Sequence, residues 1–182
     1  MTALTSTQDS SPGSDSPSNE GTHAVVSNFG ALATSNWTVD ESRSSMDDSR
    51  TVTLQLLADG SFSSWANEEH TPSLIIRCKE NGTDLYVVNG TAANPELGLF
   101  DRATVRLRID DGKPYSERWS ESTDDEALFA PPISLARRLA HAERLTYQFT
   151  PFNSSPVTVA FTVKGLDQVL QKVADACSWP TG

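Results

Sequence analysis

The chain has 182 residues, a length that fits one domain with a terminal extension. Its 24 acidic residues outnumber its 14 lysines and arginines, and the net charge of −10 argues against a general nucleic-acid binder and against a polybasic membrane patch. No stretch approaches the length of a transmembrane helix, so we expect no membrane insertion.

Residues 1–28 differ in composition from the rest of the chain. They are rich in Ser, Thr, Pro, Gly and acids, and they cannot bury enough apolar surface to offset the cost of ordering the backbone. The sequence therefore predicts a disordered tail over 1–28 and one β-rich domain over 29–182. After Met1 there is neither a basic start nor an apolar run, so no signal peptide is expected, which favours a cytoplasmic or virion location unless a signal has been removed.

The first half of the domain is predicted to consist of short strands and turns. Val52, Leu54 and Leu56 alternate with polar residues, which is the pattern of a half-buried strand. Asn81-Gly82 between two apolar runs is a strong hairpin signal. In order, the predicted segments are a strand at 35–39 led by Trp37, a polar loop at 40–50, a strand at 51–57, a hairpin of 74–78 and 85–88 turned by 80–82, and a connection at 89–101.

The second half begins with a clear antiparallel hairpin. Val105, Leu107 and Ile109 alternate with charged residues, and Asp110 to Pro114 supply the turn into an extended run anchored by Trp119. The remaining predictions are an irregular segment that returns Leu128 and Phe129 to the core, a helix at 133–142, strands at 145–149 and 157–163, and an amphipathic helix from Leu166 to Cys177. About eight strands and two helices predict a mainly β (α+β) fold, an antiparallel β-sandwich or curled sheet.

The two cysteines, Cys78 and Cys177, are expected to lie close together. Cys78 shares a strand face with Ile76, and Cys177 ends the apolar stripe of the last helix. If both side chains face the core, the two sulfurs can meet there, and a bridge requires their Cα atoms to lie within about 7 Å. They would be bridged in an oxidising compartment and free buried thiols elsewhere; a bridge closing about 100 residues contributes roughly 4 to 5 kcal/mol.

Three arginines on the 104–120 hairpin form a candidate partner surface. Arg106, Arg108 and Arg118 could make one basic strip for an anionic partner. The alternative is cross-strand pairing with Glu117 or Glu121, which is the commoner arrangement because opposite charges stabilise paired strands.

The acidic pairs do not point to catalysis. Adjacent acids in loops are usually turn formers or solvated residues, and no recognised catalytic, zinc, calcium or phosphate-binding motif is present. We therefore expect no enzyme activity, no metal site and no cofactor. The pairs are Asp47-Asp48, Asp110-Asp111 and Asp124-Asp125.

Several blocks carry a family resemblance through their order and spacing. They are Trp37 with DDS at 47–49, IRCKENGTDLYV at 76–87, RIDDGKP at 108–114, WSESTDDEALFAP at 119–131, TPFNSSPVTVAF at 150–161 and GLD…ACSW at 165–179. Over roughly residues 35–179 the chain resembles the VasI/TagO family associated with type VI secretion. Ser178 stands where this family has Gly.

The resemblance implies a small envelope accessory protein without known catalytic residues. It also implies that Cys78 and Cys177 are the family's paired cysteines, and it suggests a periplasmic location. We therefore expect a non-catalytic interaction domain with protein partners in a larger assembly. The alternative is a phage virion structural protein, for capsid decoration or associated with the tail, which needs no export signal.

Overall fold

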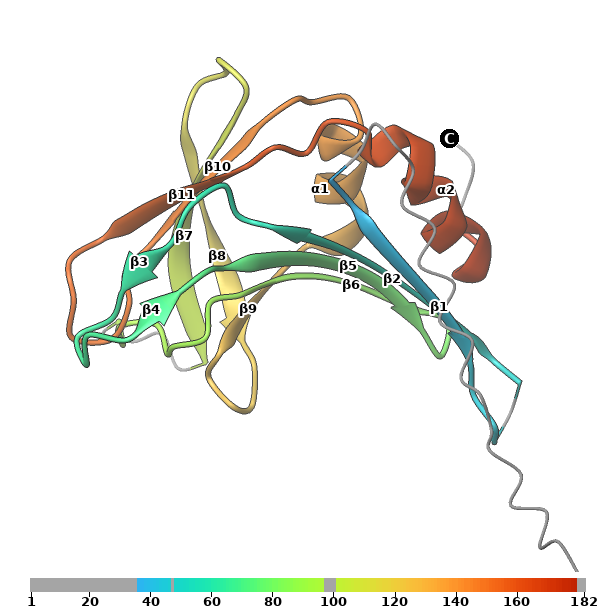
Figure 1. Cartoon of the computed structure of the whole chain (residues 1–182), viewed down its shortest axis with the longest axis horizontal. Coiled ribbons are helices and arrows are strands. Elements are labelled where there is room, and N and C mark those ends of the chain that lie inside the picture. The colour runs from blue at the N-terminus through green and yellow to red at the C-terminus, as the bar shows by residue number, and fades with distance from the viewer. Residues whose placement is uncertain (1–35, 47, 97–100, 180–182) are drawn as a thin grey trace, which may run out of the picture.

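The computed structural model describes residues 36–46, 48–96 and 101–179, and the predicted tail at 1–28 lies outside them. The described chain forms a nine-stranded sheet, a two-stranded hairpin and two helices (Figure 1). The elements are β1 (Thr38–Arg43), β2 (Arg50–Leu57), β3 (Phe62–Ser63), β4 (Glu69–His70), β5 (Ser73–Lys79), β6 (Gly82–Val88), β7 (Arg102–Ile109), β8 (Tyr115–Glu121), β9 (Ala127–Ala130), α1 (Pro132–Leu139), β10 (Leu145–Phe149), β11 (Val157–Phe161) and α2 (Leu166–Ala176).

The nine strands lie in the order β1-β2-β5-β6-β9-β8-β7-β10-β11, and every neighbouring pair is antiparallel. The sheet curls until the segment after β2 lies beside β11, where the Asp59 N–H donates to the Ala160 carbonyl at 2.7 Å. The buried Trp37 indole donates to the Val163 carbonyl at 3.1 Å and ties the first strand to the same region. The predicted mainly β class is confirmed, as a curled open sheet rather than two stacked sheets.

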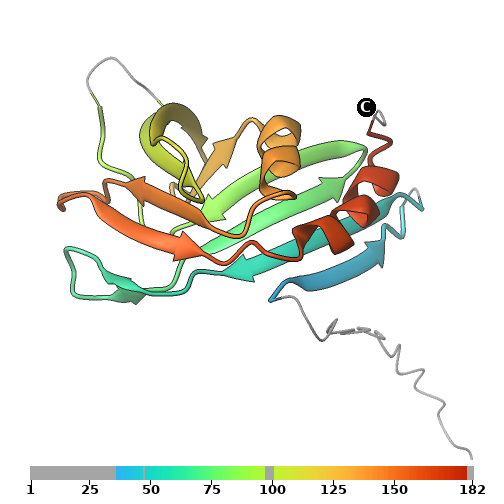
Figure 2. The same cartoon turned by 90° about the horizontal axis from the view of Figure 1, so that it is seen from above.

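The concave side of the sheet holds the core, because alternate residues of each strand point there. Both helices cover this side: α2 packs on β2 and β5, and α1 packs on β6 (Figure 2). Their spacing of apolar residues gives each helix one buried stripe. The helix residues buried in the core are Leu135, Ala136 and Leu139 of α1 and Leu166, Val169, Leu170 and Val173 of α2.

The first strand differs from the prediction. The predicted polar loop at 40–50 contains most of β1, which runs over Thr38–Arg43 and pairs with β2. An edge strand held by backbone hydrogen bonds needs no apolar face, and all but one of its side chains are exposed. The charged residues that suggested a loop are those that protect an exposed sheet edge.

The segment after β8 is also more regular than expected. Ala127–Ala130 forms β9, a central strand between β6 and β8, where an irregular segment was predicted. Leu128 faces the core as predicted, but Phe129 points to the convex side and stacks on Tyr86 with ring centroids 4.6 Å apart. Four residues are too few to show alternation, and one of the two partner strands, β6, is distant in sequence.

Smaller differences concern turns and ends. Glu80 and Asn81 both have positive φ and form the two-residue turn between Lys79 and Gly82, so Gly82 belongs to the strand instead of the turn. The short hairpin of β3 and β4 was not predicted. The predicted helix at 133–142 is observed over Pro132–Leu139.

Candidate interaction surface

A disulfide joins Cys78 on β5 to Cys177 at the end of α2, with Cα atoms 5.6 Å apart. Cys78 is fully buried, so the bond fixes the helix end to the concave side of the sheet. Beyond the helix, the Trp179 indole donates to Thr83 Oγ1 at 2.7 Å. This geometry agrees with the predicted proximity of the two cysteines. It fixes the C-terminal end of α2 to β5 and β6.

The three predicted arginines lie on the convex face of β7 and β8. In the register of β7 and β8, Arg106 lies opposite Ser116 and Arg118 lies opposite Thr104. Arg106 and Arg118 are therefore diagonal neighbours across the two strands. Diagonal neighbours on one face lie about 7–8 Å apart. All three arginines are exposed, and Arg108 follows Arg106 by two residues on the same face.

Arg102 extends the same row, and we call Arg102, Arg106, Arg108 and Arg118 the arginine strip. Arg102 is exposed, shares the period-two face of Arg106 and lies opposite Ser120. The sequence prediction missed it because the predicted strand began two residues later. Extending the alternation of Val105 and Leu107 backwards to Ala103 would have found it.

The predicted alternative, cross-strand pairing with Glu117 or Glu121, is wrong. Both glutamates have the period-two phase of Trp119 and so leave β8 on the face opposite Arg118, and Glu117 Oε2 accepts a hydrogen bond from the Trp119 indole at 3.1 Å. In the described part of the chain, no carboxylate forms an ion pair with Arg102, Arg106 or Arg118. A carboxylate within the strip is that of Glu96, which accepts hydrogen bonds from the N–H and the hydroxyl of Thr104, both at 2.8 Å, and leaves the three guanidinium groups without an ion pair.

Arg108 is held differently from the rest of the strip. Its Nη2 lies 3.3 Å from Asp111 Oδ1, and its Nε donates to the Gly112 carbonyl at 3.1 Å. Arg106 and Arg108 also line a shallow hollow of about 130 Å³ with Pro114 and polar side chains of β10 and β11. The strip thus combines an oriented arginine, free arginines and a small depression beside them.

The acidic pairs act in turns, as their sequence context predicted. Asp110 has φ 48°, and its Oδ1 accepts hydrogen bonds from the backbone N–H groups of Glu143 and Arg144 at 3.0 and 2.8 Å. Asp124 accepts from the Ser122 hydroxyl and from the Glu126 N–H, and these bonds lower the pKa of its carboxyl. Asp47 lies outside the described residues.

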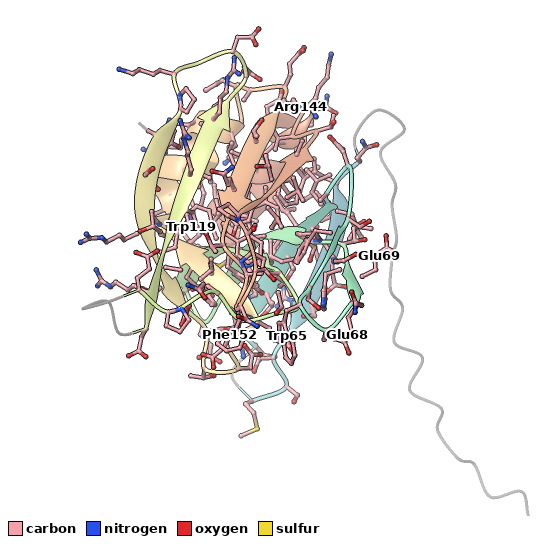
Figure 3. The ribbon with its side chains drawn as sticks, turned by 90° about the vertical axis from the view of Figure 1, so that its left-hand side faces the viewer. Trp65, Glu68, Glu69, Trp119, Arg144 and Phe152 are labelled. Atoms are coloured by element: carbon pink, nitrogen blue, oxygen red, sulfur yellow. A yellow bond between two sulfur atoms is a disulfide. The ribbon has the colours of Figure 1, made fainter. Side chains whose placement is uncertain are left out.

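A pair of exposed aromatic rings was not predicted. Trp65, in the turn between β3 and β4, is 58% exposed, and Phe152, in the turn between β10 and β11, is 43% exposed. The rings meet edge to face with centroids 6.5 Å apart, and Figure 3 shows them side by side at one end of the sheet. Their sequence separation gave no sign that they would meet, because the contact depends on how the sheet curls.

The end of the molecule that carries this pair is acidic. It is built from segments 61–70, 89–96, 121–127 and 150–153, none of which contains Lys or Arg. Burial raises the pKa of the Glu121 carboxyl, and the carboxylates of Asp125, Asp101 and Glu96 raise it further. The acids of these four segments are Glu68, Glu69, Glu96, Glu121, Asp124, Asp125 and Glu126.

The described residues contain neither a metal-binding cluster nor a membrane-spanning helix. No cluster of three or more His, Cys, Asp or Glu side chains is arranged to hold a metal ion, and no described helix combines the length and apolar character needed to cross a membrane. Comparison with protein-family models, with curated proteins and with solved structures found no match to this chain.

Proposed function

We propose that this chain is a non-catalytic protein-interaction domain of the VasI/TagO kind, and that it binds an anionic segment of a partner protein through the arginine strip. The observation that carries the proposal is the strip itself, in which Arg102, Arg106 and Arg118 project from one face without an ion-pair partner in the described chain. Guanidinium groups form bidentate, charge-assisted hydrogen bonds with carboxylates, which suits them to this task.

The surroundings of the strip support a protein partner. The convex face continues over Ser120 to the stacked rings of Tyr86 and Phe129, and the Arg77 guanidinium lies 5.5 Å from the Tyr86 ring centroid. Tyr, Phe and Arg are enriched at protein–protein interfaces. A face that combines charged and half-buried aromatic groups fits an acidic polypeptide with apolar residues between its acids.

The net charge of −10 adds selectivity to such a site. Most of the surface repels an anionic segment, so a partner gains attraction only when its acids face the strip. Complementary charges of this kind determine orientation and specificity more than raw affinity. We therefore expect the affinity for the partner to fall as the salt concentration rises, because exposed charges are screened beyond about 8 Å at physiological ionic strength.

The assignment to a secretion-associated assembly is tested by cross-linked pull-down from the envelope fraction of a type VI-positive bacterium. The baits are the wild type, the double variant Arg106→Glu/Arg118→Glu, and Arg43→Glu/Lys79→Glu, a charge-matched control on the distant strands β1 and β5. Secretion components should be captured by the wild type and the control and lost from the double variant. Capture that is equal for all three baits would reject the strip, and capture of no secretion component would reject the assignment.

The alternative proposal, a virion structural protein, has a separate test. Mass spectrometry of purified particles should then detect this chain in fixed ratio to the capsid or tail proteins. Its absence from particles would exclude the alternative, and its presence there would replace the secretion assignment while leaving the arginine strip as the binding surface.

A further inference from the structure

The exposed ring pair has a rigid support. The Phe152 N–H donates to the Ala92 carbonyl at 2.8 Å, and the Asn94 N–H donates to the Thr150 carbonyl at 2.8 Å. On the other side, the Ser64 N–H donates to the Glu68 carbonyl at 2.9 Å and closes the turn that carries Trp65. These backbone hydrogen bonds fix the turns that carry the two rings, so the turns lose little conformational freedom when a partner binds.

The pair also stands out among exposed apolar groups. The described chain has four large hydrophobic side chains that are exposed, and of these only Trp65 and Phe152 touch each other. Met46 and Leu57 lie elsewhere, on the β1–β2 turn and at the end of β2. Single exposed apolar residues are normal, whereas adjoining exposed rings from separate turns form a surface that can receive another group.

Two carboxylates, those of Glu68 and Glu69, lie at the same end of the molecule as this ring surface and favour a cationic group there. The Glu68 side chain is 73% exposed, and its Oε2 lies 3.9 Å from His70 Nε2. Figure 3 shows Glu68 and Glu69 on the same end of the molecule as Trp65 and Phe152. The neighbouring segments add further acids and no Lys or Arg. The face of an indole ring attracts cations within about 6 Å of its centroid, and a nearby carboxylate adds a counter-charge.

We propose that this aromatic acidic end binds a cationic segment of a protein partner, with an Arg or Lys side chain over the Trp65 ring and Glu68 as its counter-charge. The chain's net charge of −10 attracts such a segment from a distance, and the ring pair determines where it docks. This surface is distinct from the arginine strip and has the opposite charge. The domain can then join an acidic partner on its convex face to a basic partner at its end.

The test uses two synthetic peptides of about 12 residues, one containing several arginines and one in which each arginine is replaced by glutamine. Each is titrated into the full ¹⁵N-labelled chain while the indole N–H signals of its four tryptophans are followed by NMR. The Trp65 signal is assigned from its disappearance in Trp65→Phe. The arginine peptide should shift the Trp65 signal in a saturable way, and the glutamine peptide should not.

Variants separate a defined site from general attraction to an acidic protein. Trp65→Ala leaves the net charge unchanged and should weaken binding about three- to ten-fold. Glu68→Gln should weaken binding about two- to three-fold more than Glu80→Gln, which removes the same charge from an equally exposed side chain on the β5–β6 turn at the other end of the sheet (Figure 1). Arg106→Glu/Arg118→Glu should not weaken it.

Three results would overturn the proposal. The first is a Trp65 signal that the arginine peptide does not shift. The second is an equal shift from both peptides, which indicates apolar docking. The third is unchanged affinity of the arginine peptide for Trp65→Ala. Loss of peptide binding here, with the pull-down through the arginine strip intact, would reject this second surface and leave the proposed function standing. Melting temperatures of the charge variants should match the wild type, and Trp65→Ala, which loses the ring contact with Phe152, should remain fully folded at the temperature of the titration.

Discussion

Cys177→Ala opens the disulfide to Cys78 and releases the end of α2 from β5. The two cysteines are 99 residues apart in sequence, and the chain-entropy model assigns a loop of this size about 4.7 kcal/mol at 25 °C. Cys177 is only half-buried, so the cavity left by alanine adds little. The buried stripe of α2, with Val169 and Val173, still packs on the sheet, so the fold should persist.

We therefore expect the free energy of unfolding to fall by about 3 to 5 kcal/mol in Cys177→Ala. Urea denaturation followed by circular dichroism measures it, and wild type treated with reductant should match the variant. A loss below about 1 kcal/mol, with thiol counting showing that the wild-type bridge was intact, would refute the reasoning from loop length. Thiol counting on protein from its native compartment tests separately whether the bond forms there.

Three further predictions concern stability. Trp37→Phe removes the buried hydrogen bond to the Val163 carbonyl and should lower the free energy of unfolding by about 1 to 3 kcal/mol in urea denaturation, with no change in far-ultraviolet circular dichroism. Asp110→Ala removes the acceptor for the backbone of 143–144 at a residue with positive φ, so it should cost about 2 kcal/mol, whereas Asp110→Asn, which tolerates this φ and keeps an acceptor, should cost less than half of that. Glu121→Gln should raise the melting temperature at pH 7.5 and leave it unchanged at pH 3.5. The pKa of Glu121 is raised in the folded state, so the protonated carboxyl stabilises the fold below the unfolded pKa of about 4.3. This contribution is lost as the pH rises through the folded-state pKa. Equal melting shifts at both pH values would contradict that assignment.

Sequence patterns predicted those parts of the fold that depend on local periodicity. The alternation of Val52, Leu54 and Leu56 identified β2, and the stripe from Leu166 to Cys177 identified α2. Edge and very short strands were missed. The polar β1 satisfies its backbone through one neighbour and needs no apolar face, and β3 and β4 are two residues each.

The candidate surfaces divide in the same way. The alternation of β7 placed Arg106 and Arg108 on one face, and the same rule could have placed Glu117 on the opposite face from Arg118, which excludes the cross-strand pair. The contact between Trp65 and Phe152 could not be predicted, because it depends on the curl that brings two distant turns together. Strand order between remote segments has no local signature in the sequence.

The arginine strip is tested most directly by fluorescence anisotropy with a labelled peptide of about 12 residues that alternates Glu with apolar residues. The wild type and the charge-matched control Arg43→Glu/Lys79→Glu should bind it with similar affinity, which should fall as salt is raised. Arg106→Glu/Arg118→Glu should bind at least about ten-fold more weakly while keeping the wild-type melting temperature. Equal affinity of the double variant and the wild type, or binding that does not respond to salt, would contradict the proposal that this strip is the partner surface.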